Sequence, residues 1–136
     1  MKEISPMPFC SKCKNSVFCA PNNPLYEVGD NLKSRKFLSF SANEYLYKTG
    51  EKAKGIFCIY SGGVRIFKSD KLYREFTVHH TSEGEIFGFH SISEGRYNNS
   101  ATATEETSAC FIPLSAINQL IIELSTVTEK ILSSKY

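Results

Sequence analysis

Residues 56–68 read IFCIYSGGVRIFK, and this stretch decides the fold that the sequence predicts. Two short runs rich in β-branched and aromatic residues flank Ser61 and the two glycines that follow it. Such runs are typical of β-strands, and glycines can adopt the positive φ that reverses a chain tightly. We therefore predict a β-hairpin in which 56–60 pairs with 64–68.

The same pattern extends outward from this hairpin, from Lys36 to Pro113, where short apolar runs are separated by regularly spaced glycines. This spacing indicates an antiparallel sandwich or barrel. A short amphipathic helix is expected over 24–33, and two helices are expected after Pro113, with Ser115 as a candidate N-cap. The apolar face of the first closing helix would contain Leu114, Ile117, Leu120, Ile121 and Leu124. The predicted class is mainly β with flanking helices.

Composition and charge limit the functions that the chain can have. Its 136 residues, 41% of them hydrophobic, suffice for one core of ordinary size. The 16 basic and 14 acidic residues are interspersed and give a formal charge of +2, so charge does not support nucleic-acid binding. No stretch resembles a signal peptide or approaches the roughly 20 apolar residues that span a bilayer. We expect a cytoplasmic protein without membrane association.

The five cysteines carry the strongest functional signal. In a reducing compartment, thiolate ligands or buried thiols are expected rather than a disulfide framework. Cys10, Cys13 and Cys19 form a C-x2-C-x5-C loop, and Cys110 follows on a predicted strand. Four thiolates suit an iron-sulfur cubane or a tetrahedral metal such as zinc, and the spacing does not separate the two. Cys58 and Cys110 both lie in apolar contexts, so we assign Cys58 as a small buried hydrophobe and leave that role open for Cys110.

Several segments of the sequence resemble the sensory domain of the FNR branch of the CRP/FNR regulators. They are residues 10–19, 46–51, 56–64, 84–89 and 105–113. The resemblance covers nearly the whole chain and implies a double-stranded β-helix, or jelly roll, of the cyclic-nucleotide-binding type. It also implies that Cys10, Cys13, Cys19 and Cys110 bind an oxygen-labile 4Fe-4S cluster. The implied function is oxygen or redox sensing for transcription regulation.

Two positions depart from the nucleotide-binding members of that family. Where those relatives hold a glutamate and an Arg-Ser-Ala step, this chain has Phe89 and Asn99-Ser100-Ala101. A phenyl ring cannot accept a hydrogen bond from a ribose hydroxyl, and Asn99 lacks the charged fork that holds a phosphate. We therefore expect no cyclic-nucleotide binding.

The predicted organisation is a cysteine-rich, cluster-binding loop over residues 1–24 and a β-roll sensor domain over 25–136 that ends in the start of a dimerisation helix. The family continues into a helix-turn-helix domain, to which nothing in this sequence corresponds. We expect no direct DNA binding by this chain alone. The last apolar positions, Val127, Ile131 and Leu132, are expected to support at most a weak homodimer or contact with a protein partner.

The sequence contains no recognisable set of catalytic residues. It lacks a P-loop, a dinucleotide-binding fingerprint and a Gly-x-Ser-x-Gly motif. Glu105 and Glu106 are adjacent, so on a strand they would face opposite sides. Of His79, His80 and His90, one is expected to be buried and two solvated, without a ligand role. The alternatives to a sensor are a small-ligand or protein-interaction module of the same fold, with a zinc or empty cysteine site, and a functionally silent remnant of a regulator.

Overall fold

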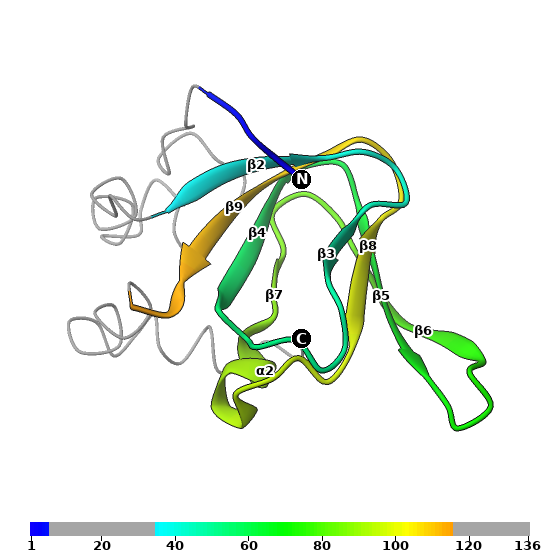
Figure 1. Ribbon diagram of the computed structural model, residues 1–136. Coiled ribbons are helices and arrows are strands. Elements are labelled where there is room, and N and C mark those ends of the chain that lie inside the picture. Colours follow the sequence, from blue (N-terminus) through cyan, green and yellow to red (C-terminus); the bar gives the residue numbers. More distant parts are fainter. Residues whose placement is uncertain (6–34, 116–136) are drawn as a thin grey trace.

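The computed structural model describes residues 1–5 and 35–115, which form two antiparallel sheets that enclose a core (Figure 1). The first sheet has the order β1-β2-β9-β4-β7 and the second the order β3-β8-β5-β6. The first sheet contains β1 (Lys2–Glu3), β2 (Lys36–Phe40), β9 (Thr107–Pro113), β4 (Gly55–Ser61) and β7 (Ile86–Phe87). The second contains β3 (Tyr45–Tyr47), β8 (Ser100–Ala103), β5 (Val64–Ser69) and β6 (Glu75–Thr81). The predicted mainly β, jelly-roll-like class is confirmed.

The core between the two sheets is rich in aromatic rings. Phe57, in β4, lies at its centre, with its ring centroid 5.1 to 6.4 Å from those of Phe40, Tyr47, Phe87 and Phe111. Aromatic pairs at such separations contribute more than their buried area alone. Every residue of β4 from Gly55 to Ile59 is buried, so both faces of this strand are covered. The continuous apolar run in the sequence reflects this double burial.

The predicted hairpin over 56–68 is wrong, because β4 and β5 belong to different sheets. The turn between them carries the chain from one sheet to the other. Gly62 has φ 96°, and a Cβ atom there would lie 2.5 Å from Thr107 Oγ1 and 2.6 Å from the carbonyl oxygen of Glu106. The Thr107 hydroxyl also accepts a hydrogen bond from the Gly63 N–H at 3.2 Å. The close approach of β9, rather than a two-strand reversal, requires glycine here.

Among the described residues, β5 and β6 form a hairpin that projects from the body of the domain (Figure 1). Its turn is organised by Asp70, whose Oδ1 accepts hydrogen bonds from the N–H groups of Leu72 and Arg74, both at 2.9 Å. The Arg74 N–H is the main cause of the lowered pKa of the Asp70 carboxyl. Tyr73 takes the left-handed conformation, with φ 61°. This turn was not predicted, because residues 70–74 contain neither glycine nor proline.

One short helix, α2 (Phe89–Glu94), was not predicted. It is bounded by Gly88 and Gly95, both with positive φ, which belong to the regularly spaced glycines that the sequence pattern indicated as breaks between strands. The helix expected over 24–33 and nearly all of the two closing helices lie outside the described residues. Helical structure has already begun at Leu114, so Ser115 is not the N-cap. In residues 1–5 and 35–115, no helix has the length and apolarity needed to cross a membrane.

Candidate functional site

Cys110 lies on β9, a strand inside the first sheet with β2 on one side and β4 on the other. Its neighbours Ala109 and Phe111 face the core cluster, and since side chains alternate along a strand, Cys110 faces away from that core. The Cys110 side chain is nevertheless buried, with 7% exposure. The structure therefore places this predicted ligand on the outer face of a rigid strand.

Cys58 is the direct partner of Cys110 across the β4–β9 ladder. The Leu114 N–H donates to the carbonyl oxygen of Lys54 at 2.8 Å in the same register. Hydrogen-bonded and non-hydrogen-bonded pairs alternate in an antiparallel ladder, so Cys58 and Cys110 form a hydrogen-bonded pair with Cα atoms about 5.5 Å apart. Cys58 is 4% exposed, as expected for a buried hydrophobe. Two thiols thus lie side by side on one face of the sheet, a pairing that the sequence analysis did not predict.

The other three predicted ligands, Cys10, Cys13 and Cys19, lie outside the described residues, so Cys110 is the one predicted ligand that the described residues include. Among the side chains that are described, no group of three or more potential metal ligands occurs. The Cys110 thiol fits the role of a ligand to a cluster or a tetrahedral metal. It faces away from the barrel core and can therefore bind a group that lies outside the barrel.

The side chains at the positions that distinguish this chain from nucleotide-binding relatives are hydrogen-bonded or buried within the domain. Asn99 is buried, and its Oδ1 accepts a hydrogen bond from the Tyr47 hydroxyl at 2.7 Å. The Ser100 hydroxyl accepts a hydrogen bond from the Thr49 N–H at 2.9 Å. Phe89, the first residue of α2, is buried as well. Asn99 and Tyr47 are neutral, so this pair offers no charge to a phosphate.

Two stacked tyrosines fill the interior beside Asn99. The Tyr47 and Tyr97 rings are nearly parallel, with centroids 3.8 Å apart. The Tyr97 hydroxyl donates to the carbonyl oxygen of Gly55 at 2.9 Å. Burial raises the pKa of both phenols, that of Tyr47 most strongly. Both hydroxyls therefore remain neutral hydrogen-bond donors at physiological pH.

A cavity of about 620 Å³ adjoins these tyrosines. Its lining combines aromatic rings, among them Tyr97 and Phe111, with Lys36, Lys52 and Lys54. Apolar walls with a few polar groups are typical of small-molecule sites. The cavity was not predicted, because its lining comes from segments that are distant in the sequence.

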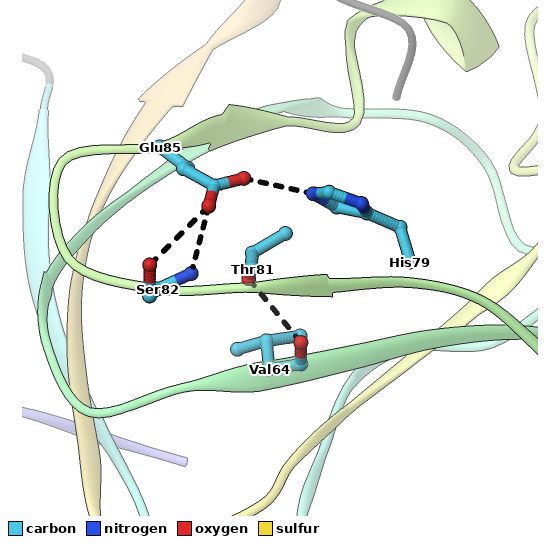
Figure 2. Close-up of polar contacts among 5 residues, drawn as sticks. All are labelled: Val64, His79, Thr81, Ser82 and Glu85. Carbon is cyan, nitrogen blue, oxygen red and sulfur yellow. Dashed lines mark hydrogen bonds and ion pairs between the residues drawn. The ribbon is translucent and has the colours of Figure 1, made fainter.

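Figure 2 shows a polar cluster between β6 and β7, in which the Glu85 carboxylate lies between His79 and Ser82. Glu85 Oε2 is 2.9 Å from His79 Nε2, and its Oε1 accepts hydrogen bonds from the Ser82 N–H and hydroxyl, both at 3.3 Å. In a catalytic triad the histidine lies between the acid and the nucleophile. Here the acid is in the middle, so His79 is not placed to take the Ser82 proton.

Two expectations about titratable side chains are corrected. His79 is only partly buried while His80 and His90 are exposed, so the expected buried histidine is not found. Glu105 and Glu106 do not lie on a strand, since they are exposed in the bend between β8 and β9. Neither correction creates a candidate catalytic pair.

Residues 37–123 match the family model of the cyclic nucleotide-binding domain. Two relatives are an anaerobic regulatory protein of Haemophilus influenzae and the fumarate and nitrate reduction regulatory protein of Escherichia coli K12. The first is 25% identical over 126 residues, covering 90% of this chain and 49% of the relative. The second is 27% identical over 115 residues, covering 82% and 45%. This chain belongs to the cyclic nucleotide-binding domain family and, within it, to the CRP/FNR regulators.

Solved structures agree on the fold. The catabolite activator protein of Thermus thermophilus has a TM-score of 0.75 at 24% identity, over 88% of this chain and 55% of that protein. The sensor domain of the transcriptional regulator DNR from Pseudomonas aeruginosa has a TM-score of 0.72 at 19% identity, over 88% and 79%. The chain spans about half the length of the curated relatives that it matches.

Proposed function

We propose that this chain is the oxygen- or redox-sensing domain of an FNR-like transcriptional regulator and that Cys10, Cys13, Cys19 and Cys110 bind a 4Fe-4S cluster. The observation that carries the proposal is the Cys110 thiol, held on the outer face of β9 in a chain that also contains a C-x2-C-x5-C loop. The names of the two relatives, an anaerobic regulatory protein and a fumarate and nitrate reduction regulatory protein, support the same function.

The position of Cys110 also provides a route by which a change at the site would reach the rest of the domain. When bound, the cluster supplies oxygen-labile iron-sulfur chemistry. Cys110 lies on a strand that pairs with β2 on one side and β4 on the other, and helical structure begins at Leu114, directly after this strand. A displacement of the Cys110 thiol would therefore act on two neighbouring strands and on the start of that helix.

We assign the described residues no part in reading DNA. Sequence-specific recognition usually requires a helix held in the major groove. The complete helix found in residues 1–5 and 35–115, α2, has six residues, too few for this task. We expect no operator binding by this chain alone. A weak homodimer or a protein partner would use the C-terminal residues, which lie outside the described part of the chain.

The cluster proposal is tested by anaerobic reconstitution of the full chain. We expect about four irons and four sulfides per chain and a broad visible absorption that bleaches in air. Replacing Cys13 or Cys110 by serine should abolish iron uptake, because three thiolates leave one corner of the cluster without its protein ligand. Iron and sulfide analysis, together with the visible spectrum, measures this result.

Cys58→Ser is the matched control, since Cys58 lies opposite Cys110 on the same face of the sheet. It should leave anaerobic iron uptake unchanged. Stoichiometric zinc without iron uptake would contradict the cluster. That result would favour a second candidate function, a small-ligand module of the same fold, for which the lysine-rimmed cavity beside the stacked tyrosines is the supporting observation.

We further propose that the chain does not bind cyclic nucleotides. Calorimetric titration with cyclic AMP or cyclic GMP should show no heat, and millimolar ligand should not raise the melting temperature. The reason is that Asn99 is neutral and already bonded to Tyr47, so a phosphate would gain no charged partner there. A nucleotide-binding catabolite activator protein, titrated in parallel, is the positive control. Saturable micromolar binding would contradict this proposal.

A further inference from the structure

The first sheet carries two thiols side by side, of which the proposed cluster uses one. We propose that Cys58 and Cys110 form a reversible cross-strand disulfide when hydrogen peroxide reaches the cluster-free chain, and that Cys58 thereby protects Cys110 from irreversible oxidation. The disulfide rests on the strand register alone. Its protective value rests on the proposed function of Cys110 as a cluster ligand.

The register brings the Cα atoms of the two residues to disulfide distance but leaves their Cβ atoms farther apart than a disulfide requires. Opposite residues in a hydrogen-bonded pair have Cα atoms about 5.5 Å apart, and disulfides span about 4.4 to 6.8 Å between Cα atoms. Opposite residues have Cβ atoms about 4.5 to 5.5 Å apart, with hydrogen-bonded pairs toward the longer end, whereas a disulfide requires about 3.5 to 4.5 Å. The two strands must therefore move closer together at this point when the bond forms, and the bond is strained. A disulfide under strain is more easily reduced, so this geometry favours a reversible link.

Burial restricts the oxidants that can act on this pair. Both side chains are almost completely covered, and each strand is paired on both of its edges. Hydrogen peroxide is little larger than water and can reach such a thiol through small openings of the structure. A bulky aromatic disulfide reagent needs a much larger opening, so it should react far more slowly with the folded chain.

The reaction balances with one molecule of peroxide. The Cys110 thiolate attacks one peroxide oxygen, the O–O bond breaks, and the leaving hydroxide takes a proton to become water, which leaves a sulfenic acid on Cys110. The Cys58 sulfur then attacks the sulfenic sulfur, and the S–O bond breaks as the departing oxygen leaves as water with the Cys58 proton. In total, two thiols and one peroxide give one disulfide and two waters. A thiol reductant returns both cysteines to their starting state.

The tryptic map of this chain identifies the disulfide partners directly, because each of the five cysteines falls on a different peptide. Cys58 lies in 55–65 and Cys110 in 97–130, while the three loop cysteines lie in 3–12, 13–14 and 15–33. The cluster-free full chain is treated with peroxide, alkylated and digested without reductant. We expect 55–65 linked to 97–130, and we expect dithiothreitol to release both peptides. A link from 97–130 to a loop peptide instead, or oxidised Cys110 without any link, would overturn the proposal.

Cys58→Ala tests the protective role. After peroxide and then dithiothreitol, the wild-type chain should recover most of its iron uptake on anaerobic reconstitution. The variant should recover several-fold less, because its Cys110 proceeds to the sulfinic acid, which dithiothreitol does not reduce. Equal recovery by both chains would refute protection. If the untreated wild type binds no iron, the proposed cluster function fails, while the peptide map on the wild type still decides whether the disulfide forms.

Discussion

Replacing Phe57 by alanine is expected to lower the free energy of unfolding by about 4 kcal/mol, the cost typical of removing a large aromatic side chain from a core. The Phe57 ring is 5% exposed and stacks on the rings of Phe87 and Phe111. Its removal opens a cavity between the sheets, and the rigid strands around it can fill that space only in part. Urea unfolding followed by circular dichroism measures the change.

Phe76→Ala is the control for this substitution. Phe76 lies on β6 with 49% exposure, so its loss should change the unfolding free energy by no more than about 0.5 kcal/mol. Similar costs at the two positions would contradict the assignment of Phe57 to the centre of the core.

Replacing Gly62 by alanine is expected to lower the free energy of unfolding by about 3 kcal/mol or more. The left-handed backbone conformation accounts for about 1–2 kcal/mol of this loss, and overpacking by the added methyl group accounts for about 1–3 kcal/mol. The added methyl group would meet backbone as well as the Thr107 hydroxyl, with Thr107 Cα at 2.8 Å and the Glu106 carbonyl oxygen closer still. The Thr107 backbone belongs to β9 and is paired with Phe40 of β2, so it cannot move aside cheaply. The melting temperature and the urea midpoint should therefore both fall.

Gly50→Ala separates the two contributions. Gly50 has φ 89°, close to that of Gly62, but a Cβ atom there would meet nothing within 4 Å. Its substitution should lower the free energy of unfolding by the backbone part alone, about 1–2 kcal/mol. If Gly62→Ala cost no more than this control, β9 would not approach the turn as closely as the structure indicates.

Local signals in the sequence predicted the class of fold but not its connections. Apolar runs broken by glycines correctly indicated antiparallel strands over 36–113. The same signals could not show that β4 and β5 enter different sheets, because a pair of glycines suits a hairpin and a crossing between sheets equally well. The turn at Asp70 and the six-residue helix α2 depend on local hydrogen bonds and caps that are weak signals in one sequence.

The candidate site was predictable to a similar extent. The sequence correctly placed Cys110 on a strand and Cys58 in a buried position. It could not show that the two are cross-strand partners, because register is set by the whole sheet. The hydrogen bond between Tyr47 and Asn99 could not be predicted for the same reason, since 52 residues separate them along the chain. The assignment of the three loop cysteines remains a prediction.

The strand order of the first sheet also bears on the synthesis of the chain. In the described residues β2 pairs with β1 and β9, so β2 lacks its main partner until the ribosome has released residues 107–113. At a synthesis rate of roughly 5–20 residues per second, β2 remains unpaired with β9 for several seconds while the intervening strands emerge. Cys110 arrives with β9, long after the loop cysteines. A nascent chain that has not yet reached Cys110 therefore cannot present all four proposed ligands, and insertion of the proposed cluster must follow the emergence of β9.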